Sequence, residues 1–255
     1  MKANVIVITN NKGGVGKSTT AEALADGLTL NKYKTLLIDF DPQGSLSTSA
    51  DQTKPTAYEI MTKQVSAADA VQQRQDRADI LPANKLLSRL NTELTDTGKE
   101  YRLKEMLAPV MSCYNYIIID TPPALSILTV NAMTAADSII IPVQADIFSL
   151  QGVGQLIESV DAIRTYTNHG LNLMGVLLTR HNARSILTRT MTDRAEKAAE
   201  AIGTFLYKTI IREAIAVKEA QASSMSLYKY APGSNPAIDY LSFVTEFLER
   251  NKNHG

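Results

Sequence analysis

Apolar, β-branched runs alternate with helical patterns along almost the whole chain of 255 residues. Continuous Ile, Val and Leu runs are typical of strands that helices cover on both faces, as in a mostly parallel sheet. Their alternation with amphipathic stretches predicts an α/β fold, doubly wound, with a mostly parallel β-sheet and helices on both faces. The runs that we predict to be strands are 5–9, 35–39, 78–81, 116–120, 138–143, 173–179 and 206–211.

The composition is that of a globular protein. Hydrophobic residues make up 44% of the chain and charged residues 20%, which excludes a disordered chain. Because no repeat, low-complexity tract or Pro/Gly-rich linker divides the sequence, we expect a single domain over residues 1–255. No apolar run reaches the length of a signal peptide core or of a membrane span, so we expect a cytoplasmic protein.

The C-terminal stretch 236–251 is predicted to form an amphipathic helix. Its polar face mixes acids and bases, which favours packing on the core over a membrane anchor with a basic face. The residues that we assign to its apolar stripe are Ile238, Leu241, Val244 and Leu248, widened by Phe243 and Phe247.

The sequence contains one cysteine, Cys113, which we expect to be a buried core thiol. A single cysteine excludes a disulfide framework and any multi-cysteine zinc or iron–sulfur site within one chain, and it indicates a reducing compartment. The histidines have no mutual spacing that is typical of a metal site.

Segment 10–19 follows the first predicted strand and precedes a helical pattern, which is the context of a phosphate loop. Its glycines let backbone N–H groups form an anion nest, and the helix presents its positive end to the same phosphates. Lys17 is expected to reach the β- and γ-phosphates, and Ser18 to bind Mg²⁺. The strict pattern G-x-x-x-x-G-K-[ST] is not met, because Asn11 stands at the first glycine position and Lys12 adds a second lysine.

Acidic residues end two of the predicted strands. Asp120 ends the apolar run 116–120, as in a Walker B element, and is expected to hold Mg²⁺. Asp39 and Asp41 lie at the end of the run 35–39. Since the carboxyl ends of parallel strands face the ligand crevice of an open α/β sheet, we expect these acids near the phosphate loop.

These motifs resemble those of the deviant-Walker ParA/MinD ATPases, a family of P-loop NTPases, and within them the small Soj-like ParA partition proteins. The resemblance covers nearly the whole chain. It is most specific at K-G-G-V-G-K-S-T over 12–19, D-F-D-P-Q-G over 39–44 and I-D-T-P-P over 119–123.

The resemblance implies roles for individual residues. Lys12 corresponds to the signature lysine, which in this family crosses to the partner's phosphates in an ATP-bound sandwich dimer. The implied catalytic residues are Lys12, Lys17 and Asp41, of which Asp41 positions or activates the attacking water. The implied Mg²⁺ site contains Ser18, Asp39 and Asp120. The implied nucleotide-binding residues are Lys12, Gly13, Gly14, Val15, Gly16, Lys17, Ser18 and Thr19, with Asn182 as the candidate for adenine.

The implied function is Mg²⁺-dependent ATP hydrolysis by a DNA partition protein in the cytoplasm, associated with the nucleoid. Such a protein binds double-stranded DNA non-specifically as an ATP-dependent homodimer, and a ParB-like centromere-binding partner stimulates its turnover. A MinD-like membrane-associated positioning ATPase is the alternative, although the tail 249–255 is too short and mixed for the required basic helix. A module that binds ATP without hydrolysing it is a third alternative, which Asp41 argues against.

The formal net charge is zero, but basic residues gather in segment 180–218, which holds eight Lys/Arg against four acids. A mixed solvated surface and a phosphate-contacting patch explain this stretch equally well. Soj-like relatives carry Pro-Arg-x-x-Arg after the seventh strand, where this chain reads Arg-Glu-Ala-Ile-Ala over 212–216. The candidate DNA contacts are Arg184, Arg189, Arg212 and Lys218.

Overall fold

The computed structural model describes residues 2–144, 147–181 and 187–252. In this part of the chain, seven strands form one sheet in the order β3-β2-β4-β1-β5-β6-β7, and every pairing is parallel. The strands are β1 (Asn4–Ile8), β2 (Thr35–Asp39), β3 (Asp79–Leu81), β4 (Tyr116–Asp120), β5 (Ser138–Gln144), β6 (Asn172–His181) and β7 (Leu206–Arg212). The predicted fold class is confirmed.

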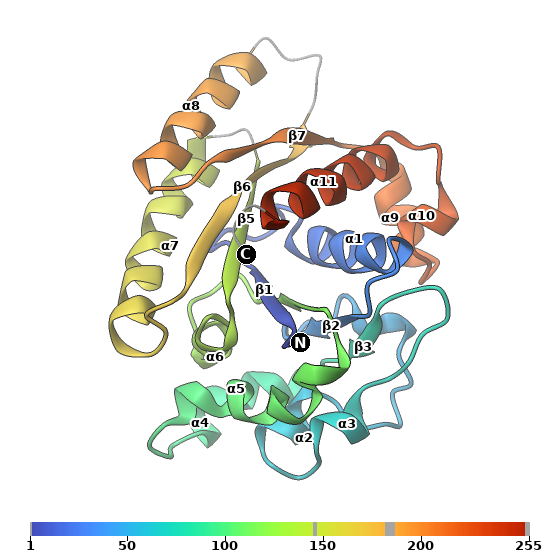
Figure 1. Ribbon diagram of the computed structural model, residues 1–255, viewed down its shortest axis with the longest axis vertical. Helices are drawn as coiled ribbons and strands as arrows, with labels where there is room; N and C mark the ends of the chain where they lie inside the picture. Colours follow the sequence, from blue (N-terminus) through green and yellow to red (C-terminus); the bar gives the residue numbers. More distant parts are fainter. Residues whose placement is uncertain (1, 145–146, 182–186, 253–255) are drawn as a thin grey trace.

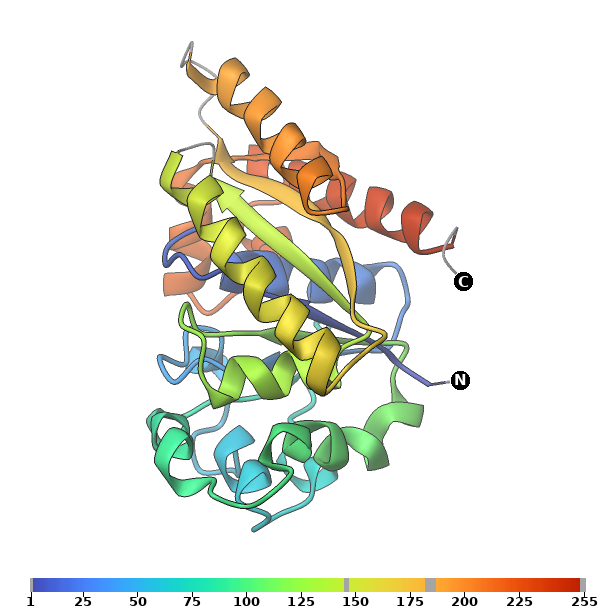
Figure 2. The same ribbon diagram turned by 90° about the vertical axis from the view of Figure 1, so that its left-hand side faces the viewer.

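Helices cover both faces of the sheet, as the two views in Figures 1 and 2 show. One face carries α1 (Lys17–Leu30), α9 (Ile215–Ala222), α10 (Leu227–Tyr230) and α11 (Asn235–Lys252). The other face carries α6 (Ile127–Ala135), α7 (Ile147–Tyr166) and α8 (Leu187–Ala201), with α2 (Ala57–Met61), α3 (Ala67–Ala70), α4 (Leu90–Glu93) and α5 (Arg102–Leu107). None of the helices in the described ranges has the length and hydropathy needed to cross a bilayer.

Strand β1 shows why the apolar runs are continuous. Val5 and Val7 belong to the hydrophobic cluster beneath α6 and α7, whereas Ile6 and Ile8 belong to the cluster beneath α1 and α11. Successive side chains of a strand point to opposite faces, so a strand that is covered twice needs an apolar residue at every position. Strand β1 is the middle strand of the sheet, and its carboxyl end leads into the loop before α1.

Helix α11 packs on α1 and β7, which confirms the prediction of a core helix. Its predicted stripe is partly wrong, because Ile238 and Leu241 are 48% and 38% exposed. The predicted residues Phe243, Val244 and Phe247 are buried, and Ala237 and Tyr240 complete the buried face. Glu246 accepts hydrogen bonds from the backbone N–H groups of Lys208 and Thr209, at 3.0 Å each. Helix α11 thereby covers unpaired backbone groups of the edge strand β7.

Cys113 is exposed, so the expectation of a buried thiol is wrong. It ends a 3-10 segment, Ala108–Cys113, that leads to β4. The apolar run that enters the core begins only at Tyr116, the first residue of β4. A cysteine this close to a buried strand therefore lies on the connection that precedes the strand, outside the core.

Gly27 lies where α1 meets α11. A Cβ atom on Gly27 would lie 2.6 Å from Cγ2 of Val244, which is a stiff side chain. We predict that Gly27→Ala is less stable to urea than Gly154→Ala by about 1–3 kcal/mol, the cost of overpacking a core. Gly154, in α7, has no atom of the described residues within 4 Å of an added Cβ, so it controls for helix propensity. Equal free energies of unfolding of the two variants would contradict this packing.

Candidate functional site

The loop between β1 and α1 has the backbone form of an anion site. Gly14 and Gly16 have φ values of 76° and 83°, in the left-handed region that glycine adopts without strain. Gly16 is the N-cap residue of α1, so the first N–H groups of the helix have no partner within the helix. The predicted phosphate loop is therefore present, at the carboxyl edge of the sheet.

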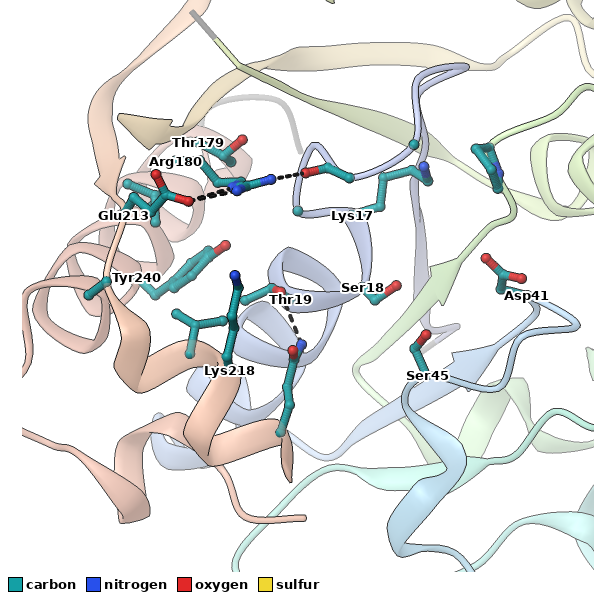
Figure 3. A pocket seen from close by; sticks show the side chains of 18 of the residues that line it. Lys17, Ser18, Thr19, Asp41, Ser45, Thr179, Arg180, Glu213, Lys218 and Tyr240 are labelled. Atoms are coloured by element: carbon teal, nitrogen blue, oxygen red, sulfur yellow. Dashed lines mark hydrogen bonds and ion pairs between the residues drawn. The ribbon is translucent and has the colours of Figure 1, made fainter. Parts of the chain in front are cut away.

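A cavity of about 360 Å³ lies beside this loop (Figure 3). The loop glycines and the first residues of α1 form one wall, and the segment 41–45 after β2 forms another. The opposite wall comes from the end of β6, from segment 211–221 and from α11. The carboxyl ends of several parallel strands thus open into one space, as expected for a ligand site of an open α/β sheet.

Lys17 lines this cavity and is buried. Its Nζ donates a hydrogen bond to the carbonyl oxygen of Lys12 at 3.0 Å. Burial lowers the pKa of Lys17, and the negative charges of Asp120 and Asp41 oppose this shift. The backbone N–H of Lys12 donates to Oδ1 of Asn10 at 3.0 Å, and Lys12 is not among the described residues that line the cavity.

Asp120 is a fully buried carboxylate. Neither of its oxygens has a hydrogen-bond partner in the described part of the chain. Burial raises the pKa of Asp120 well above its ordinary value, repulsion from Asp39 adds to the shift, and the Ser18 hydroxyl and Lys17 oppose it. Buried polar groups without partners are rare, and oxygen donors of this kind are the ligands that Mg²⁺ takes. Asp120 and Ser18 therefore fit a Mg²⁺ ion.

Asp39 faces Asp120 in the register of β2 and β4, but its oxygens already have partners. Oδ2 accepts from the N–H of Leu46 at 3.0 Å and from the hydroxyl of Ser47 at 2.7 Å, and Oδ1 accepts from the N–H of Asp41 at 3.3 Å. Burial raises the pKa of Asp39 to about 6. These bonds favour a role of Asp39 in holding segment 41–47 in place. Direct binding of Mg²⁺ by Asp39 stays a prediction.

Asp41 is half-buried and lines the cavity across from Lys17 and Ser18 (Figure 3). Its Oδ1 accepts a hydrogen bond from the N–H of Gln43 at 2.9 Å. Among the described residues, no hydrogen bond engages the second oxygen of the carboxylate, which leaves it available to a ligand in the cavity. The structure thus places this predicted catalytic acid beside the predicted phosphate-binding groups.

The far wall of the cavity was not predicted from the sequence, apart from the end of β6. Asn182, the residue predicted to contact adenine, lies outside the described residues, whereas Thr179 and Arg180 just before it line the cavity. The apolar part of the wall consists of Ile211, Ala214, Val217 and the ring of Tyr240. The hydroxyl of Tyr240 lies 3.0 Å from Oγ1 of Thr20. No single motif links these residues, because they come from β7, α9 and α11.

Of the candidate DNA contacts, Arg212 and Lys218 both line the cavity, and the side chains of the other two lie outside the described set. Arg212 forms an ion pair with Asp239 of α11, with Nη2 2.6 Å from Oδ1. Lys218 lines the cavity and extends into it from α9 (Figure 3). Arg184 lies outside the described residues, and Arg189 lies in α8, where its side chain is outside the described set. DNA contact by these residues stays a prediction.

The family of this chain follows from comparison with known proteins. A family model described as an AAA domain matches residues 3–173. The sporulation initiation inhibitor protein Soj of Bacillus subtilis is 36% identical over 248 residues, which cover 95% of this chain and 97% of Soj. The chromosome partitioning protein ParA of Caulobacter vibrioides is 34% identical and is covered to 97%, with 99% of this chain aligned.

Solved structures of related proteins are similar to this chain over nearly its whole length. Cobyrinic acid a,c-diamide synthase from Mycobacterium smegmatis, with bound ADP and magnesium, superimposes with a TM-score of 0.85 at 29% identity, over 99% of this chain and 97% of that chain. A McdA variant from Cyanothece in complex with ATP gives a TM-score of 0.82 at 25% identity, over 97% of each chain. The chain belongs to the ParA/MinD-like family of P-loop ATPases.

Because the carboxylate of Asp120 has no hydrogen-bond partner in the described chain, we predict that Asp120→Asn is more stable than the wild type and that the difference depends on pH. A raised pKa means that the folded state binds this proton more tightly than the unfolded chain, so the wild type loses stability as pH rises toward the raised pKa. Asp120→Asn does not titrate, and without nucleotide or metal its stability advantage grows with pH and then levels off at about 1–3 kcal/mol.

Urea unfolding between about pH 5 and 8 measures this difference. The control is Asp161→Asn, which removes an equal charge from an exposed position on α7. An Asp120→Asn protein that is less stable than the wild type throughout this range would show that the charge is compensated in the native state.

Proposed function

We propose that this chain is a Mg²⁺-dependent ATPase that acts in DNA partition, as one domain over residues 1–255. The observation that carries the proposal is the buried carboxylate of Asp120, which has no hydrogen-bond partner in the described chain. It lies close enough to Ser18 and Lys17, two residues that line the cavity beside the phosphate loop, for both to oppose the rise of its pKa. Bound ADP and magnesium in the M. smegmatis relative and ATP in the Cyanothece relative support these cofactors.

In this proposal, the loop N–H groups, the N-terminus of α1 and Lys17 bind the β- and γ-phosphates. Ser18 and Asp120 hold Mg²⁺, which when bound neutralises charge on the phosphates. Asp41 orients the attacking water from across the cavity, while Asp39 keeps segment 41–47 in position. Lys12 is proposed to act on the phosphates of a second copy, as the family resemblance implies.

The base is proposed to lie against the apolar wall on the far side of the cavity. Ile211, Val217 and the ring of Tyr240 provide a surface for a flat aromatic group. Lys218 extends into the same space and is proposed to bind the nucleotide in addition to, or in place of, DNA. The cavity is large enough for such a ligand, because binding sites of small molecules start at a few hundred Å³.

The partition role rests on the similarity to Soj and to ParA over nearly the whole chain. It includes an ATP-dependent homodimer, non-specific DNA binding on the nucleoid and a ParB-like partner that stimulates turnover. The MinD-like alternative requires a lipid-binding helix, whereas two acids of α11, Asp239 and Glu246, pair with β7.

Substitutions of Asp41 and Lys17 separate turnover from binding. We predict that Asp41→Ala binds Mg-ATP within about threefold of the wild type but hydrolyses it at least about 100-fold more slowly, because the water is no longer oriented. Lys17→Ala should lose nucleotide affinity itself. Equilibrium binding of a fluorescent ATP analogue and steady-state phosphate release measure the two effects, with Asp161→Ala as the control. Wild-type turnover by Asp41→Ala would contradict the assigned role.

DNA binding is predicted to require Mg-ATP and to be independent of sequence. Affinity for two unrelated duplexes should be equal, and it should fall at least about tenfold between 50 and 200 mM salt. Arg194 and Lys197, exposed on α8, should contribute, so changing both to Gln weakens binding, whereas Lys63→Gln does not. Affinity that is indifferent to ATP and salt would contradict the partition role, and ATP-dependent flotation with anionic vesicles would favour the MinD-like alternative.

A further inference from the structure

Two consecutive carbonyl groups of the phosphate loop accept hydrogen bonds from two consecutive side chains at the end of β6. The hydroxyl of Thr179 lies 2.7 Å from the carbonyl oxygen of Val15 and 3.1 Å from that of Val143. The guanidinium of Arg180 donates through Nη1 to the carbonyl oxygen of Gly14 at 2.9 Å. These are long-range contacts, separated by 164 and 166 positions in the sequence.

The contacts fix the orientation of two peptide groups. A trans peptide is planar, so its N–H points away from its C=O. Holding the carbonyls of Gly14 and Val15 therefore also sets the directions of the N–H groups of Val15 and Gly16. Successive N–H groups in such a loop form the concave anion site that receives a phosphate. The end of β6 thus controls the part of the loop that has to be correctly oriented before a phosphate arrives.

Arg180 is itself held in place from the other wall of the cavity. Its Nε and Nη2 donate to Oε1 of Glu213 at 3.0 Å and 2.6 Å, and the N–H of Glu213 donates to the carbonyl oxygen of His181 at 3.1 Å. Figure 3 shows Arg180 between Glu213 on one side and the phosphate loop on the other. The backbone of Arg180 has a φ of 52°, which an arginine adopts only where its surroundings require it.

We propose that Thr179 and Arg180 are positioning residues that orient the N–H groups of Val15 and Gly16 toward the β-phosphate of the nucleotide, and that Glu213 holds Arg180 in this position. The proposal rests on the nucleotide-binding function proposed above. Both members of the Arg180–Glu213 pair are partly exposed, and exposed pairs add little to stability, so the effect of the pair falls on the geometry of the loop. Glu213 stands where Soj-like relatives carry arginine, and its ion pair with Arg180 gives a reason for an acid at this position.

Binding of MgADP and of AMP to four proteins tests this proposal. Thr179→Val removes the hydroxyl without changing the size of the side chain, and Thr179→Ser retains the hydroxyl. Arg180→Met removes the donor at a partly exposed position, so it remains informative if the buried Thr179→Val protein fails to fold. We expect Thr179→Val and Arg180→Met each to lose about five- to tenfold in affinity for MgADP, the equivalent of one hydrogen bond. AMP, which lacks the β-phosphate, should bind each variant within about twofold of the wild type.

The experiment separates a failure of the proposed nucleotide-binding function from a failure of the positioning role of Thr179 and Arg180. A wild-type protein that binds neither nucleotide would overturn the proposed function. A wild-type protein that binds MgADP, together with Thr179→Val and Arg180→Met proteins that bind it equally well, would overturn only the positioning role. An equal loss of affinity for MgADP and AMP would also overturn it, because a general change of the fold does not distinguish the β-phosphate. Rescue of MgADP affinity in Thr179→Ser is the result expected from the hydroxyl contact.

Discussion

The rest of the site depends on how the buried charge of the Asp120 carboxylate is compensated. Removing a charge from water costs several kcal/mol, and Asp120 has no hydrogen-bond partner in the described chain to offset that cost. The strand order adds to the cost, because β2 and β4 are neighbours and their register brings Asp39 opposite Asp120. A site of this kind persists in a stable fold when a cation completes it. Ser18 and Lys17, at the start of the helix after β1, provide part of the compensation, and a Mg²⁺ ion would provide the remainder.

The cavity has two ends that different parts of the chain build. The phosphate end is local, since the loop and the start of α1 are consecutive in sequence. The opposite end is assembled from β6, from segment 211–221 and from α11, and Arg180 bridges the two by contacting both Glu213 and Gly14. A single side chain, that of Arg180, therefore links the phosphate end of the cavity to the opposite end.

Local sequence patterns predicted the parts of the structure that local physics determines. Each predicted strand lies within two residues of an observed one at both ends. For central strands such as β1 the reason is that a strand covered on both faces must be apolar at every position. For α11 the pattern predicted the buried residues Phe243, Val244 and Phe247 correctly. It did not predict that Ile238 is exposed or that Tyr240 reaches Thr20 of α1. The burial of Tyr240 and the contact of Thr179 with Val15 depend on elements far apart in sequence, which no periodicity records. The exposure of Cys113 depends likewise on where the 3-10 segment joins the sheet.

Charge counts along the sequence overstate the positive surface of segment 180–218. Of its eight basic residues, Arg180 and Arg212 pair with Glu213 and Asp239, and the shortest N–O distance in each pair is 2.6 Å. Asp239 lies outside the counted segment, so the count includes Arg212 but not the acid that neutralises it. Helix α8 differs, because Ala195 and Ala199 are buried while Arg194 and Lys197 are exposed. Three acids of the same helix, Asp193, Glu196 and Glu200, are exposed as well, so the described part of α8 presents a mixed charged surface and not a purely basic one.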